Sequence, residues 1–130
     1  WFDNVKASMP ETVAYRGKVA FDKSVFTLKD YTALLFPTYY PGEGLAGTVI
    51  DAFAAGLPVV ASDWHDNANI ITDNKNGFIF PTHDVNRLAE IILDIYKCQD
   101  RLVPMKLNCI QSAQAFLPPM VIRTIAEEIA

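Results

Sequence analysis

The chain has 130 residues, which is long enough for one hydrophobic core and too short for two. Hydrophobic residues make up 51% and charged residues 20%, which is ordinary for a globular domain. The net charge is −4 and the eleven Lys and Arg residues form no basic stripe, which argues against nucleic acid as a partner. No apolar run approaches the roughly 18 residues that a membrane span needs.

The first third of the chain predicts four short elements: a helix end at 1–7, a strand at 12–16, a helix within 23–31 and a strand at 33–36. Gly17 ends the first strand, and Phe26 and Leu28 are expected to face inward. Residues 33–36, Ala-Leu-Leu-Phe, form the clearest buried strand. Pro37 ends it, because proline cannot donate to a sheet ladder.

Residues 39–62 predict a turn-rich loop, an apolar helix at about 47–55 and a buried strand at 58–62. A loop that opens a helix after a strand presents free N–H groups and the positive end of the helix dipole to an anion. Glu43 and Asp51 would repel a bare phosphate, so the ligand must also offer hydroxyl groups to these acceptors. A nucleoside diphosphate sugar offers both kinds of group.

The last half of the chain predicts a short helix in which Ile70 and Ile71 belong to the core, a turn, and a strand at 78–80. Asp84 caps the first of three further helices, at about 84–98, 104–116 and 120–130. Their expected inward residues are Val85, Leu88, Ile91, Ile92 and Ile95, then Met105, Cys109, Ala113 and Phe116, then Val121, Ile125 and Ile129. Strands that alternate with helices predict a parallel sheet covered on both faces.

Two histidines and two cysteines are predicted to have no chemical role. His65 and His83 lack a Ser, Cys or metal-ligand partner at a meaningful spacing and are predicted to be solvated surface residues. Cys98 and Cys109 lie in apolar helical patterns with no metal or redox spacing, so they are predicted to be small buried hydrophobic residues in the reduced state.

The stretch from Glu43 to Asp51, EGLAGTVID, resembles the E-x7-E motif of family 4 glycosyltransferases of the GT-B fold. Residues 76–81, NGFIFP, resemble the next strand of that family. Asp51 stands where the pattern usually has Glu, which shortens the reach of the carboxylate, and Ala46 stands where it often has Gly. The resemblance covers most of the chain, from about residue 13 to the end.

The resemblance implies a Rossmann-like parallel sheet with helices on both faces, as part of the second of two domains. The strand, loop and helix that open this domain in the family, with Arg and Lys contacts to the diphosphate, have no counterpart here. We therefore interpret residues 1–130 as a single, partial nucleotide-sugar-binding domain. As a fragment it should be inactive alone, because the acceptor-binding domain is a missing partner.

The implied reaction is transfer of a sugar from a nucleoside diphosphate to an acceptor hydroxyl, with retention of the anomeric configuration and no metal or cofactor. Glu43 is the expected catalytic residue and orients the sugar, and Asp51 holds the ribose. The other expected substrate-binding residues are Gly42, Gly44, Leu45, Ala46, Gly47 and Thr48 in the loop and helix start, and Gly17, Lys18 and Val19 near the base. For the Lys18 side chain, a plain strand-to-helix turn is the preferred interpretation.

By analogy with the family, the enzyme would act in polysaccharide or cell-envelope glycan synthesis. It would be cytoplasmic, at the inner face of the cytoplasmic membrane, and any peripheral membrane association would run through the missing domain. A nucleotide-sugar donor is the expected small-molecule partner.

An alternative motif occupies the same loop. Gly42, Gly44 and Gly47 satisfy G-x-G-x-x-G, and Asp63 ends the next strand, as in an NAD(P)-type dinucleotide-binding Rossmann domain. However, several residues separate the strand from the first glycine. Glu43 would also face the pyrophosphate, where two like charges at about 4 Å repel by about 4 kcal/mol at an effective dielectric near 20. A second alternative is a nucleotide-sugar-binding domain that has lost catalysis.

Overall fold

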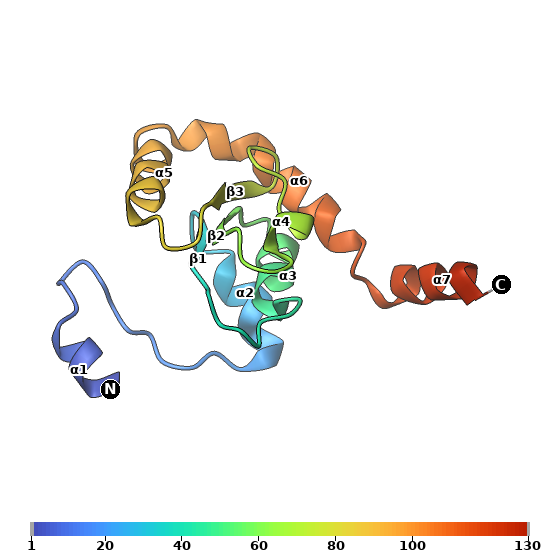
Figure 1. Cartoon of the computed structure of the whole chain (residues 1–130), viewed down its shortest axis with the longest axis horizontal. Helices are drawn as coiled ribbons and strands as arrows, with labels where there is room; N and C mark the ends of the chain where they lie inside the picture. The colour runs from blue at the N-terminus through green and yellow to red at the C-terminus, as the bar shows by residue number, and fades with distance from the viewer. Residues whose placement is uncertain (1, 130) are drawn as a thin grey trace.

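The computed structural model of the protein describes residues 2–129 and is built around a three-stranded parallel sheet of order β1-β2-β3. The strands are β1 (Leu34–Phe36), β2 (Val59–Ser62) and β3 (Gly77–Phe80). The helices are α1 (Phe2–Ala7), η1 (Phe21–Lys23), α2 (Ser24–Leu28), α3 (Gly47–Ala54), α4 (Asn67–Ile70), α5 (Val85–Lys97), η2 (Gln99–Leu102), α6 (Val103–Gln114) and α7 (Pro118–Ile129). Figure 1 shows α1 and α7 at opposite ends of the molecule.

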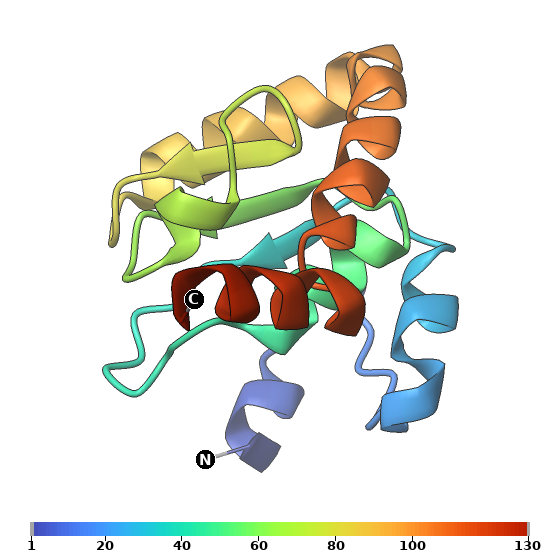
Figure 2. The same cartoon turned by 90° about the vertical axis from the view of Figure 1, so that its right-hand side faces the viewer.

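Helices cover both faces of the sheet. Successive strand residues point to opposite faces, so Val59 and Ala61 enter one hydrophobic cluster and Val60 enters the other. The first cluster joins the sheet to α3 and α6, and the second joins it to α5, η2 and the start of α6. Figure 2 shows α5 on one side of the sheet and α2 and α3 on the other. The expected parallel sheet with helices on both faces is therefore confirmed.

Most predicted elements from residue 33 onward are present within a residue or two of their expected bounds. Asp84 caps α5 as expected, because its carboxylate accepts a hydrogen bond from the Arg87 N–H at 2.8 Å. The last helix starts at Pro118 rather than at residue 120, since proline is tolerated in the first turn, where N–H groups have no helical partner. Trp1, Ala130 and the side chain of Ile129 lie outside the described residues.

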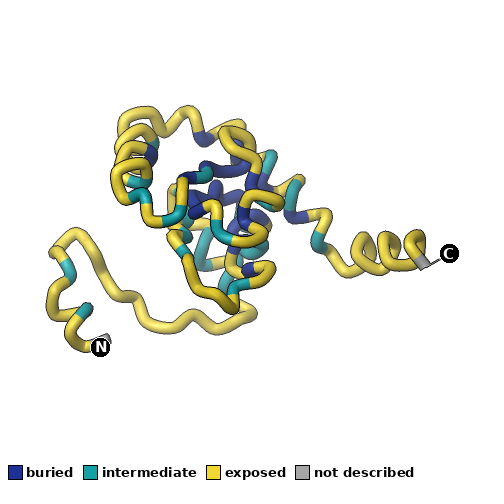
Figure 3. Tube along the Cα trace, in the orientation of Figure 1, coloured by how far each residue is buried: buried dark blue, intermediate teal, exposed yellow. Residues whose placement is uncertain are grey.

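The predicted strand at 12–16 is wrong. Residues 11–20 form no regular element and all are exposed. A strand needs a neighbour to pair its N–H and C=O groups, and the three described strands pair only with one another. Figure 3 shows this segment and α7 as exposed stretches beyond the buried sheet.

Several residues predicted to be buried are exposed. Phe26 and Val85 are each 73% exposed and Leu35 is 47% exposed, so β1 is not the buried strand that was predicted. Leu34 and Phe36 pack on the first cluster, but β1 is an edge strand and Leu35 faces the other side, where α5 packs against β2 and β3. Other exposed residues on predicted inward faces are Ile92, Cys98, Val121 and Ile125.

Asn76 ties α6 to the start of β3. Its side-chain amide donates to the Ile70 carbonyl at 3.2 Å and to Ser112 Oγ at 3.0 Å, and its Oδ1 accepts from the Thr72 N–H at 2.8 Å. The buried Cys109 thiol donates to the Asn76 carbonyl at 3.3 Å, and burial raises the pKa of Cys109 to about 12. Cys109 is therefore a neutral core residue, as predicted.

Candidate functional site

The carboxyl ends of the three strands meet at one edge of the sheet, which is where open α/β sheets bind ligands. The loop that follows β1 leaves the sheet at Pro37 and leads into α3. The residues after β2 and β3 lie beside it, because the register pairs Phe36 with Ala61 and Ser62 with Phe80. The predicted loop and helix start are thus at this edge.

The start of α3 leaves a row of backbone N–H groups without partners. Ala46 is the N-cap residue, with an extended backbone, and its carbonyl accepts from the Val49 N–H at 2.9 Å. Among residues 2–129, no acceptor is bound by the N–H groups of Gly44, Leu45, Ala46, Gly47 and Thr48. Helix starts in this state bind anions, because the N–H groups and the helix dipole both favour negative charge.

Gly44 and Gly47 keep the front of this loop open. A Cβ atom added at either position would meet nothing within 4 Å. Gly42 differs, because a Cβ atom there would lie 2.8 Å from the ring of the exposed Tyr40 side chain. A ligand can therefore approach the N–H groups over Gly44 and Gly47.

Glu43 is half-buried and held at two points. Its Oε2 accepts a hydrogen bond from Thr38 Oγ1 at 3.0 Å, and its backbone N–H donates to the Tyr40 carbonyl at 3.0 Å. The Tyr40 carbonyl also accepts from Trp64 Nε1 at 2.8 Å. The turn that carries the Glu43 carboxylate is thus stabilised by hydrogen bonds to the Tyr40 carbonyl.

Asp51 lies one turn into α3 and is half-buried. No group within the described part of the chain donates a hydrogen bond to its carboxylate. Among the same residues no side-chain oxygen or nitrogen is buried without a partner, so the carboxylate reaches solvent. Its two oxygens are therefore open to hydrogen bonds from a ligand.

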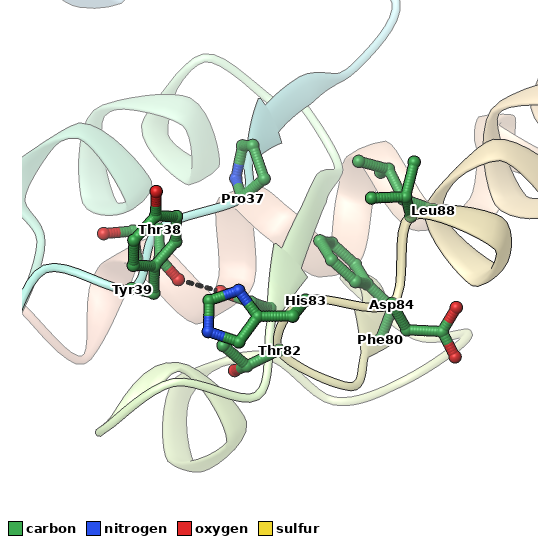
Figure 4. A pocket seen from close by; sticks show the side chains of 10 residues that line it. Pro37, Thr38, Tyr39, Phe80, Thr82, His83, Asp84 and Leu88 are labelled. Atoms are coloured by element: carbon green, nitrogen blue, oxygen red, sulfur yellow. Dashed lines mark hydrogen bonds between the residues drawn. The ribbon is translucent and has the colours of Figure 1, made fainter.

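A cavity of about 180 Å³ adjoins the loop, between the ends of β1 and β3 and the start of α5. Figure 4 shows Pro37, Phe80 and Leu88 along its apolar wall. At its rim the rings of Tyr39 and His83 are tilted, with centroids 4.8 Å apart. Sequence reasoning correctly placed His83 at the surface but missed its position at this cavity, because the left-handed backbone at His83 (φ 69°) has no sequence signal.

A family model described as "Glycosyl transferases group 1" matches residues 6–116 of the chain. The chain belongs to this family. The predicted resemblance to the group is therefore confirmed. The stretch from Glu43 to Asp51, which resembles the E-x7-E motif, coincides with the loop and helix start described above.

Two curated glycosyltransferases are similar in sequence to the chain. The poly(ribitol-phosphate) alpha-N-acetylglucosaminyltransferase of Staphylococcus aureus (strain COL) is 35% identical over 69 residues, which cover 52% of this chain and 14% of that protein. A GDP-mannose-dependent alpha-(1-6)-phosphatidylinositol monomannoside mannosyltransferase of Mycobacterium tuberculosis (strain ATCC 25618 / H37Rv) is 31% identical over 98 residues, which cover 72% and 26%. The chain thus spans only a small part of these relatives.

Solved structures confirm the fold. A sucrose-phosphate synthase from Thermosynechococcus elongatus superposes with a TM-score of 0.81 at 21% identity, over 98% of this chain and 32% of that one. TarM superposes with a TM-score of 0.74 at 20% identity, over 96% and 25%. These superpositions confirm the expected GT-B type of fold.

Within residues 2–129, no hydrogen bond joins the three predicted base-binding residues to the loop. Gly17, Lys18 and Val19 are exposed in the irregular segment before η1. The hydrogen bonds that join residues 38–43 to one another and to the end of β2 involve none of them. Their role stays a prediction.

The dinucleotide alternative is weakened by the surroundings of Asp63. One oxygen of Asp63 accepts hydrogen bonds from Thr82 Oγ1 at 2.6 Å and from the Thr82 N–H at 2.7 Å. These bonds, with the side-chain bond the larger cause, lower the pKa of Asp63. The carboxylate that would bind a ribose therefore ties the end of β2 to the turn after β3.

Residues 2–129 contain no group of three or more His, Cys, Asp or Glu residues that could hold a metal ion. His65 is exposed as predicted and packs edge-on against the Trp64 ring, with centroids 4.8 Å apart. No helix in the described part of the chain is long and apolar enough to cross a lipid bilayer.

Proposed function

We propose that the chain is the donor-binding part of a longer, retaining glycosyltransferase that moves a sugar from a nucleoside diphosphate to an acceptor hydroxyl. The proposal rests on one observation: free hydrogen-bond donors and carboxylate acceptors occur together at one helix start. N–H groups from Gly44 to Thr48 have no partner among the described residues, and the carboxylates of Glu43 and Asp51 are close by in sequence on the same loop and helix. A ligand that satisfies both has an anionic part and a hydroxyl-bearing part.

Each part of the donor then has an assigned partner. The diphosphate lies against the N–H groups at the start of α3, where the helix dipole also favours negative charge. Glu43 accepts hydrogen bonds from the hydroxyls of the transferred sugar, and Asp51 accepts them from the ribose. Gly17, Lys18 and Val19 meet the base, and this contact rests on the family resemblance.

Cleavage of the bond between sugar and diphosphate leaves positive charge on the sugar ring and negative charge on the leaving group. N–H groups fixed in advance stabilise the departing diphosphate without having to reorganise. Glu43 and Asp51 orient the donor, and neither acts as a general base. The proposed chemistry uses no metal and no cofactor.

The proposal assigns the remaining parts of the site to regions outside residues 1–130. These are the Arg and Lys contacts to the diphosphate and the acceptor-binding domain. The chain alone should therefore bind the donor weakly and transfer nothing. The names of the two curated relatives support an acceptor among cell-envelope glycans. By analogy with the family, the proposed reaction takes place at the cytoplasmic face of the membrane.

A ligand panel on the full-length protein tests the proposal. Thermal shifts are measured with UDP, GDP, their sugar conjugates and NAD. We expect one nucleoside diphosphate to stabilise the protein, and Asp51→Ala to weaken its affinity about tenfold, since a hydrogen bond to a charged group is lost. Asp94→Ala, which removes an exposed carboxylate on α5, is the matched control and should change nothing. A response to NAD alone, or to no ligand, would contradict the proposal.

A further inference from the structure

We propose that Thr38 is a positioning residue that fixes which oxygen of Glu43 faces the donor sugar. This inference rests on the proposed function, because it concerns the carboxylate assigned to the sugar. Thr38 lies two residues beyond the end of β1, next to Pro37. Its hydroxyl is 3.0 Å from Glu43 Oε2 and 3.3 Å from the backbone nitrogen of Tyr40.

The direction of the Thr38 proton follows from its two neighbours. The Tyr40 N–H can only donate, so Thr38 Oγ1 accepts there. A hydroxyl has one proton, and a carboxylate oxygen accepts it. Thr38 therefore donates to Glu43 Oε2, and this bond leaves Oε1 without a donor among the described residues.

The backbone of Thr38 is itself fixed to the neighbouring strand. Its carbonyl accepts a hydrogen bond from Ser62 Oγ, and Ser62 is buried at the end of β2. The Tyr40 carbonyl accepts from Trp64 Nε1, which also follows β2. The backbone of Thr38, which carries the hydroxyl, is thus anchored to the end of β2.

Glu43 needs such a constraint, because its side chain has three rotatable bonds and stands at the entrance of an exposed loop. With Oε2 bound to Thr38 and the backbone N–H bound to Tyr40, the free Oε1 has a fixed place. Prearranged groups contribute most in the transition state, because no ordering is left to be done there. Thr38 should therefore affect kcat more than donor KM.

The test compares three single variants of the full-length protein. Thr38→Val keeps the branched shape and removes the hydroxyl, and we expect kcat for transfer to fall about tenfold with donor KM changed by less than about threefold. Thr38→Ser keeps the hydroxyl and should restore most of the rate. Thr82→Val is the matched control: its hydroxyl is bonded to Asp63 at the same edge of the sheet, and its rate should stay within about twofold of the parent.

A double variant shows whether Thr38 acts through Glu43. If it does, adding Thr38→Val to Glu43→Ala lowers kcat no further than Glu43→Ala alone. A parental rate for Thr38→Val, an equal loss in Thr38→Ser, or a multiplied loss in the double variant would each overturn the inference. An unchanged rate for Glu43→Ala alone would instead overturn the proposed role of Glu43, so the two failures can be told apart.

Discussion

Replacing Glu43 with alanine in the full-length protein is expected to lower the rate of sugar transfer about 100-fold and to leave the unfolding temperature within about 2 °C of the parent. Glu43 is half-buried in a loop, and among residues 2–129 its side chain makes one hydrogen bond, to Thr38. Little folding free energy depends on that contact. In the proposed function, by contrast, the carboxylate orients the donor sugar, so the rate of transfer should fall. Initial rates of transfer and thermal unfolding measure the two effects separately.

The control for this variant is Glu90→Ala. Glu90 is an exposed carboxylate on α5, paired with Arg87 at 2.9 Å and remote from the loop in sequence. Exposed pairs of this kind contribute about 0–1 kcal/mol, so both rate and stability should stay near parental values. A parental transfer rate in Glu43→Ala would remove Glu43 from the site.

Gly77→Ala is expected to destabilise the chain by about 3 kcal/mol or more. A Cβ atom at Gly77 would lie 2.2 Å from the Val59 carbonyl oxygen and 2.9 Å from the Ile71 side chain. Val59 and Gly77 are paired in the ladder between β2 and β3, so the oxygen cannot retreat without disturbing the sheet. Urea unfolding of parent and variant under the same conditions measures the loss.

Gly44→Ala is the matched control for Gly77→Ala. No atom lies within 4 Å of a Cβ at Gly44, and its backbone is not left-handed. Its stability should therefore stay within about 1 kcal/mol of the parent. Equal unfolding midpoints for Gly77→Ala and the parent would contradict the close approach of Gly77 to the Val59 carbonyl oxygen.

The parts of the fold that could be predicted from sequence are those with local signals. The short apolar run after Pro58 marks β2, the N-G turn at Asn76 and Gly77 marks β3, and Asp84 marks the start of α5. Each signal depends on a few adjacent residues. The same holds for the loop with Glu43 and Asp51, because the motif is contiguous in sequence.

Features that depend on distant neighbours could not be predicted. Leu35 is an apolar residue in an apolar run, which predicts burial. Its exposure depends instead on which elements cover that face of β1. The segment at 12–16 has a strand-like pattern but no partner strand in the described residues. Hydrophobic periodicity shows that a side chain is suited to burial and does not show what lies opposite.

The hydrogen bonds around Glu43 also depend on residues that are distant in sequence, so they could not be predicted. Ser62 and Trp64 each contact a carbonyl 24 positions away, in Thr38 and Tyr40. These contacts follow from the register of β1 on β2, in which Phe36 pairs with Ala61. A sequence motif identifies the carboxylate, but only the paired strands show what holds it.

The proposed function requires that a nucleoside diphosphate bind the N–H groups at the start of α3 that have no partner among the described residues. Hydrogen–deuterium exchange of the full-length protein tests it most directly, with and without the nucleotide that responds in the ligand panel. These N–H groups should exchange fast in the free protein, and binding should slow peptides covering residues 43–51 at least about tenfold. A distant peptide from the end of α5 should be unaffected. Unchanged exchange at 43–51, with protection in another segment, would contradict the claim.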